Sequence, residues 1–244
     1  HLMELVTLSH LEGFYYKPRM DKEILRKYSP GLIALSGCIG GEIPRAVYRQ
    51  DFEGAAKLVS QYKEIFGKDN FFIETSHHPA IPNHAEIQKA LWQLAAETKT
   101  PLVATQDSHY LRPEDAEAQD VLLAVQTNTR LDDEDRLTMK ADDFSFQSPK
   151  AMREYFRDIP EAAENTLEIA RRINLEIPLG VLQLPHFGVP GGFTPESYLE
   201  KLCQEKIRTR YPNPSEEIKK RLQYELAVIN KTGFSAYFLI VQDF

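Results

Sequence analysis

The first 130 residues alternate short apolar runs with stretches of helical periodicity, and this alternation restricts the fold more than any other feature of the sequence. The strand candidates are 31–38, 70–76 and 101–106, and the helix candidates are 42–66, 83–98 and 113–126. Strands that are apolar on both faces are typical of parallel sheets covered by helices. The sequence therefore predicts an α/β fold built on a parallel sheet.

A dense run of proline and glycine marks a predicted domain boundary. The breakers in this run are Pro178, Gly180, Pro185, Gly188, Pro190, Gly191, Gly192 and Pro195. Such a density is typical of an irregular linker. We predict a first domain over 1–177, a linker over 178–195 and a mostly helical second domain over 196–244.

The remaining segments are predicted to be helices joined by polar stretches. The acidic segment 131–143 (LDDEDRLTMKADD) is interpreted as a solvated connection. Further helices are expected at 148–156, 160–173, about 195–210 and about 215–231, followed by the apolar run 234–244.

The sequence shows no membrane-spanning or export signal and argues against a disulfide scaffold. Apolar runs such as 32–35 and 237–241 are far shorter than the roughly 18–20 residues that span a bilayer, and no export signal opens the chain. The two cysteines, Cys38 and Cys203, lie far apart with no pairing framework. We expect a cytoplasmic protein with no membrane partner.

The formal net charge of −7 argues against this chain wrapping a nucleic-acid backbone by itself. Any polynucleotide contact is therefore expected to be local. The best candidate positions are Lys206, Arg208, Arg210, Lys219, Lys220 and Arg221. The alternative, which charge alone favours, is a set of solvated cations on helices that also carry glutamates.

Each predicted strand of the first domain is followed by residues that can bind a metal ion. Cys38 ends the first strand, Glu74 with His77 and His78 ends the second, and Asp107 with His109 ends the third. The carboxyl ends of parallel strands meet at one edge of a sheet, so these side chains can converge there. Thiolate, imidazole and carboxylate suit Zn²⁺ or another transition metal better than Mg²⁺. In an extended segment, Asp107 and His109 would share one face.

Each of these residues also has a structural interpretation. Cys38 alone could be a small buried hydrophobe. His77 and His78 could form a loop pair before Pro79, and the 107–109 segment could be a turn with a hydrogen-bonded histidine. Their shared position at three strand ends favours a joint site. The other histidines, including His84, show no such placement.

Several segments resemble the PHP region of bacterial DNA polymerase III α subunits. The similarity is carried by EGFYYKPRMDKEIL (12–25), GLIALSGCIGGEIP (31–44) and PLVATQDSHYLRPEDAEAQDVLLAVQTN (101–128). Further matches are DFSFQSPKAMREYF (143–156), IPEAAENTLEIARRINLEI (159–177) and ELAVINKTGFSAYFLIVQDF (225–244), the last resembling the entry to that family's palm. The similarity is collinear over nearly the whole chain.

The resemblance implies part of a distorted seven-stranded β/α barrel, followed by a linker and the start of a polymerase palm. It implies a DNA-directed DNA polymerase, a nucleotidyltransferase of DNA replication, whose PHP domain supports 3′–5′ exonuclease proofreading in some members. By motif position, Cys38, His78, Asp107 and His109 match metal ligands of that family. Counting from Glu74 selects His78, with His77 as the alternative.

The same resemblance implies which groups the chain lacks. The family's first ligands would lie upstream of His1, and its polymerase aspartates downstream of Phe244, so no catalytic residue is assigned here. We expect Zn²⁺ or Mn²⁺ in an incomplete PHP site, and Mg²⁺ in the parent polymerase. DNA, dNTPs, the sliding clamp and other replisome subunits are expected partners through the parent protein. Exposed strand edges of a partial barrel predict self-association.

Two other functions compete with this interpretation. A free-standing PHP phosphoesterase would share the metal face but would not need residues 195–244. A non-catalytic PHP scaffold would need neither Cys38 nor the 107–109 pair. The coherent set of ligand types favours a site over a scaffold.

Overall fold

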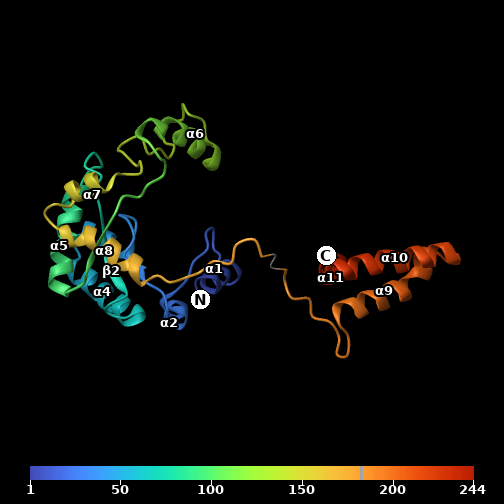
Figure 1. The fold of residues 1–244 in the computed structure, drawn as a ribbon. Helices are drawn as coiled ribbons and strands as arrows, with labels where there is room; N and C mark the ends of the chain where they lie inside the picture. The colour runs from blue at the N-terminus through green and yellow to red at the C-terminus, as the bar shows by residue number, and fades with distance from the viewer. Residues whose placement is uncertain (182–183) are drawn as a thin grey trace. The chain divides into compact units, whose positions relative to one another are not determined.

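The computed structural model of the chain describes residues 1–181 and 184–244 (Figure 1). The chain divides into two compact units, His1–Asn174 and Leu175–Phe244. The division falls close to the predicted linker, while the domain assignments themselves stay predictions. Each unit is described by itself below.

The first unit contains a parallel sheet in the order β1-β2-β3. Its strands are β1 (Ala34–Leu35), β2 (Phe71–Ser76) and β3 (Leu102–Thr105). Ala34 pairs with Phe71, and Ile73 pairs with Leu102. The predicted α/β fold with a parallel sheet is confirmed. The strand expected over 31–38 is much shorter than predicted, because only Ala34 and Leu35 pair with β2.

Helices pack around this sheet (Figure 1), and together they bury one apolar core. They are α3 (Glu42–Tyr48), α4 (Phe52–Phe66), α5 (His84–Thr98) and α8 (Pro160–Arg172). Among the core side chains, Val59 of α4, Ile73 of β2 and Leu91 of α5 are all buried. The apolar spacing in each helix follows the helical period, so one face of each helix is directed into this shared core, and α4, α5 and α8 pack directly on the sheet.

The expectation of a single helix over 42–66 is wrong. Helix α3 ends at Tyr48, and Gln50 has a left-handed backbone with φ 61°. Asp51 then starts α4 by accepting a hydrogen bond from the Gly54 amide at 2.9 Å. An N-cap carboxylate satisfies an amide that has no partner within the helix, so it stabilises this break.

The described residues contain two further helices near the N-terminus that we did not predict from the sequence. These are α1 (Leu2–Leu11) and α2 (Lys22–Tyr28). Helix α1 buries Leu5 and Ser9, and α2 buries none of its residues. Because each helix buries few residues, the sequence carries only a weak amphipathic signal.

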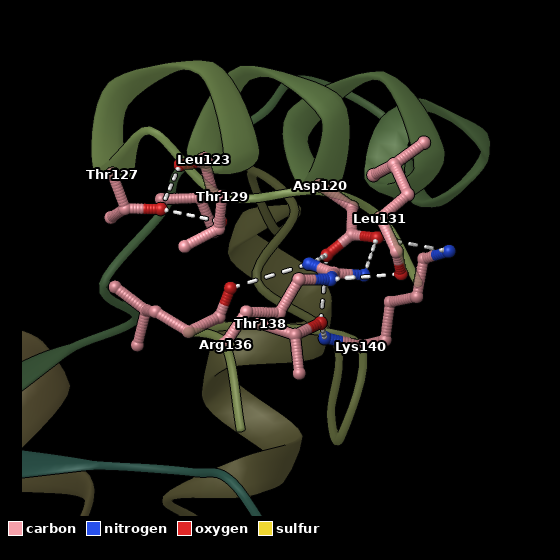
Figure 2. Close-up of polar contacts among 9 residues, drawn as sticks. Asp120, Leu123, Thr127, Thr129, Leu131, Arg136, Thr138 and Lys140 are labelled. Atoms are coloured by element: carbon pink, nitrogen blue, oxygen red, sulfur yellow. Dashed lines mark hydrogen bonds and ion pairs between the residues drawn. The ribbon is translucent and has the colours of Figure 1, made fainter. Parts of the chain in front are cut away.

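The interpretation of 131–143 as a solvated connection holds for most of its residues, which are exposed, but not for Arg136, whose side chain is bound to a buried carboxylate. A short 3₁₀ turn (Pro113–Asp115) leads into α6 (Ala116–Thr127), whose Asp120 is only 2% exposed. Figure 2 shows Arg136, Thr138 and Lys140 reaching this carboxylate. The segment is therefore fixed to α6 by a network of ion pairs and hydrogen bonds around a buried carboxylate.

The second unit consists of α9 (Pro195–Arg210), α10 (Glu216–Thr232) and α11 (Ser235–Asp243). Its core is formed by Leu199, Leu226 and Leu239, one from each helix. The predicted helices at about 195–210 and 215–231 are confirmed. In the described ranges, no helix is long and apolar enough to cross a membrane.

Candidate metal-binding rim at the carboxyl edge of the sheet

The parallel strands bring the predicted ligand segments to one edge of the sheet. Cys38 lies beyond β1, His78 beyond β2, and Asp107 beyond β3. Side-chain hydrogen bonds join the three strands near this edge. The Glu74 amide donates to Ser36 Oγ at 2.9 Å, and Thr105 Oγ1 donates to Glu74 Oε1 at 2.7 Å.

His78 is the most unusual residue of this edge, because it is buried without any hydrogen-bond partner. The residue is 3% exposed, and both ring nitrogens are unpaired among the described residues. Its ring stacks on Phe144 with centroids 4.4 Å apart. Buried polar atoms almost always have a partner, so an orphaned imidazole calls for a bound ion or another explanation. Neutral imidazole nitrogen is a common ligand of transition metals.

Electrostatics keep this imidazole neutral. Burial lowers the pKa of His78, and the negative charges of Asp142 and Asp107 oppose that shift only in part. An uncharged ring keeps a free lone pair at neutral pH. His78 therefore has the protonation state that a metal ligand needs.

His84 lies against His78, although its sequence position gave no reason to expect it. The two rings meet edge to face with centroids 5.4 Å apart, and His84 Nε2 lies 3.1 Å from Ser76 Oγ. Burial, together with the neighbouring His78, lowers the pKa of His84 to about 4. His84 is the first residue of α5. Its contact with His78 arises because α5 packs against β2, which the sequence pattern does not indicate.

The Asp107–His109 pair is held in a turn, not in the extended segment that the sequence analysis assumed. Asp107 has φ 53°, a left-handed backbone that is uncommon for a residue other than glycine. His109 Nδ1 lies 2.7 Å from the Asp107 carbonyl oxygen and 3.8 Å from Asp107 Oδ1. The two side chains are therefore neighbours because the backbone bends at Asp107, and not because they share one face of an extended segment.

The segment 142–147 fixes this rim from outside the sheet. The His109 amide donates to the Phe144 carbonyl at 2.8 Å, and the Phe146 amide donates to the Tyr110 carbonyl at 3.0 Å. Asp142 Oδ2 accepts a 2.7 Å hydrogen bond from the Ala80 amide, just beyond His78. The segment therefore holds the loop after β2 and the loop after β3 together.

Phe144 joins two of the predicted ligands. It stacks on His78, and its ring meets His109 edge to face with centroids 5.9 Å apart. His77, the alternative to His78, instead stacks on Tyr155 at 4.2 Å. The apolar residues of DFSF at 143–146 were the one sequence signal of this segment.

Cys38 does not take part in this cluster. Its side chain is exposed, in the loop between β1 and α3. Over residues 1–181 and 184–244, no group of three or more His, Cys, Asp and Glu side chains is arranged to hold a metal ion. The residues present thus fit a metal site only in part: His78 is a suitable donor, but the described side chains do not complete a coordination shell.

Two families match parts of the chain. Residues 1–78 match the PHP domain, and residues 197–244 match the family described as bacterial DNA polymerase III alpha NTPase domain. The matched ranges include β1, β2 and His78 in the first unit, and α10, α11 and all but the first two residues of α9 in the second.

Curated relatives match the chain over its whole length. The DNA polymerase III subunit alpha of Borreliella burgdorferi is 43% identical and that of Treponema pallidum 39%, and the chain covers 21% of each. The corresponding subunit of Thermus aquaticus is 35% identical, with 25% of its length covered. The chain therefore spans between a fifth and a quarter of the length of these relatives.

Proposed function

The chain belongs to the family of bacterial DNA polymerase III α subunits over its whole length, and on that premise we propose that it is part of a replicative DNA-directed DNA polymerase. The parent protein acts on DNA and dNTPs, with Mg²⁺ as its polymerisation metal. It contacts the sliding clamp and other replisome subunits through regions outside this chain.

One observation carries this proposal. The similarity to proteins named DNA polymerase III subunit alpha covers both units, at 33–43% identity in eight relatives. A free-standing PHP phosphoesterase would account for the match at 1–78 but not for the match at 197–244. The polymerase interpretation accounts for both.

We further propose that the first unit is part of a seven-stranded PHP barrel, with β1, β2 and β3 as three of its strands. His78, Asp107 and His109 would hold Zn²⁺ or Mn²⁺ at the carboxyl edge, with Cys38 as a further ligand by its motif position. The orphaned nitrogens of His78 support this assignment. A bound ion of this kind supplies Lewis-acid chemistry and a water of lowered pKa.

The residues of the chain would orient that site and shape its surroundings. Phe144 and His84 fix the ring of His78, and the His109 amide fixes the 107–109 turn against Phe144. Such support determines the direction in which ligand lone pairs point. We propose 3′–5′ exonuclease proofreading as the activity of the complete site in the parent protein, and a non-catalytic scaffold as the competing role.

Primer extension tests the proposed polymerase function. The full gene product that contains this chain is expected to extend a primed template with dNTPs and Mg²⁺. The 244-residue chain alone is expected to show no extension, because it supplies no residue assigned to nucleotidyl transfer. A full gene product that is folded but inactive on every primed template would contradict the proposal.

Zinc binding by the chain tests the assignment of His78. Equilibrium dialysis is expected to show at most one Zn²⁺ per chain, bound weakly, with binding lost in His78→Leu. In EDTA the same variant should be at least as heat-stable as the parent chain, because leucine removes two buried unpaired nitrogens.

His186→Leu is the matched control, because His186 is exposed and belongs to the other unit. It should leave zinc binding unchanged. Equal zinc binding by the parent chain and by His78→Leu would exclude His78 as a ligand.

A further inference from the structure

The end of the α9–α10 hairpin is strongly basic, although the chain as a whole is acidic. Between residues 206 and 221, six cations stand against only Glu216 and Glu217, a net charge of +4, whereas the whole chain carries −7. The cations are Lys206, Arg208, Arg210, Lys219, Lys220 and Arg221. The hairpin therefore concentrates positive charge at its turn.

Most of these cations have no acidic partner. Lys219 pairs with Glu216 at 2.7 Å, and Arg221 pairs with Glu225. In the part of the chain that the structure describes, Lys206, Arg208, Arg210 and Lys220 form no ion pair. Like charges held together repel one another, so this arrangement favours binding of an anion.

Five of the six cations line two clefts beside α9 and α10. Lys206, Arg210 and Arg221 line a cleft of about 380 Å³ together with Tyr211. Arg208 and Lys219 line the other, larger cleft, of about 1000 Å³. In each cleft, α9 and α10 both contribute a cation. The smaller cleft has the higher charge, because its three cations face only Glu225.

Tyr211 gives the smaller cleft a second property. It follows the last residue of α9 and is 48% exposed. Exposed aromatic rings beside cations are typical of sites that bind nucleic-acid strands, since a base can stack on the ring while phosphates contact the cations.

The N-terminus of α10 does not by itself explain an anion site here. The first turn of α10 already carries Glu216 and Glu217, so a lone anion is not favoured at that helix N-terminus.

We propose that the cleft formed by Lys206, Arg210, Arg221 and Tyr211 binds the backbone of a single DNA strand. The two unpaired cations contact phosphates, Glu225 orients Arg221 beside them, and Tyr211 stacks on a base. The choice of DNA as the polymer rests on the proposed function. The anionic character of the ligand rests on the cations alone.

Fluorescence anisotropy with the 244-residue chain tests this site. The probes are a labelled single strand of about 20 nucleotides and its duplex, measured between about 50 and 200 mM KCl. The double variant Lys206→Gln with Arg210→Gln should weaken single-strand binding about tenfold at the lower salt and reduce the salt slope by about 1.4. Tyr211→Leu should weaken the single strand about fivefold and the duplex less.

The charge-matched control combines Lys57→Gln with Lys219→Gln. Both lysines are ion-paired, Lys57 with Glu53 at 2.7 Å and Lys219 with Glu216, and neither lines the smaller cleft. The control should change single-strand affinity less than about threefold, because paired cations displace fewer counterions. An equal loss in the two double variants would show a nonspecific charge effect and overturn the proposal.

Two other results are also decisive. Polyglutamate that binds as tightly as DNA, with the same sensitivity to Lys206 and Arg210, would identify an acidic polypeptide as the ligand and overturn the proposal. If the cleft binds DNA as expected but the full gene product fails to extend primers, the polymerase proposal fails while the cleft assignment stands.

Discussion

Phe71→Ala is expected to lower the free energy of unfolding of the first unit by about 3–5 kcal/mol. Phe71 is the first residue of β2, pairs with Ala34 of β1 and is 1% exposed. Its ring stacks on Tyr62 of α4 with centroids 5.3 Å apart. Truncation removes the contact between sheet and helix and leaves a cavity that the surrounding strands can fill only in part.

Urea unfolding followed by circular dichroism measures this loss. Phe52→Ala serves as the control, because Phe52 lies on the same helix as Tyr62 but is 50% exposed. The control should lower stability by less than about 1 kcal/mol. A Phe71→Ala protein as stable as the control would mean that β2 does not form the centre of this core.

Asp120→Asn is expected to release the segment 130–140 from α6. Arg136 forms two hydrogen bonds with Asp120, at 2.7 and 2.6 Å, and Thr138 donates a third at 2.8 Å. Arg136 Nε also donates to the Leu131 carbonyl at 3.1 Å. Asparagine cannot balance the guanidinium, whose side chain is only 10% exposed, so a buried charge would be left without its partner.

Limited trypsin digestion measures this release, because Arg130, Arg136 and Lys140 are cleavage sites in the segment. Cleavage there should become at least about tenfold faster in Asp120→Asn. Glu154→Gln is the control, since it removes the partner of Arg157 in an exposed pair and should change nothing. Unchanged cleavage in Asp120→Asn would show that the network does not hold the segment.

The same network predicts how protection depends on pH. Hydrogen bonds from Arg136 hold the pKa of the Asp120 carboxyl far below its usual range. The unfolded segment therefore takes up a proton at higher pH than the folded one. Protection should be complete above about pH 4, the ordinary pKa of aspartate, and decline as pH falls toward the folded pKa. Amide exchange of residues 131–140 measures it, and Asp120→Asn should lose this pH dependence.

Much of the fold could be predicted because burial leaves a periodic pattern in the sequence. The apolar runs around Ile73 and Val103 predicted β2 and β3, and the helical spacing around Leu91 predicted α5. The break at Gln50 was missed because the apolar spacing on either side of it remains compatible with one long helix. Its local signal was Asp51 three residues before Gly54, the positions joined by the N-cap hydrogen bond.

The Asp120 network could not be predicted in the same way. Sixteen residues separate Asp120 from Arg136, and the acidic residues around Arg136 resemble a solvated segment. Only the folded chain shows which of the many carboxylates becomes buried. Ion pairs between residues far apart in the sequence leave no periodic pattern, so they cannot be predicted from sequence periodicity.

Part of the candidate rim could be predicted from the rule that the carboxyl ends of parallel strands meet at one edge of a sheet. The residues that pack against His78 could not be predicted from that rule. Placement after parallel strands selected His78 and the 107–109 pair, and the sheet does bring these segments to one edge. Phe144 lies far from His78 in the sequence, and His84 follows it after a short loop. Their contacts with His78 depend on tertiary packing, which has no signature in the sequence. Cys38 shares the edge but points to no partner in the described residues.

X-ray absorption at the zinc edge tests the central claim that the orphaned imidazole of His78 is a metal ligand. With substoichiometric zinc, the parent chain should show imidazole scattering with a zinc–nitrogen distance of about 2.0–2.1 Å, and His78→Leu should lose that contribution. Oxygen ligands alone in the parent chain, or identical spectra for the two proteins, would contradict the claim.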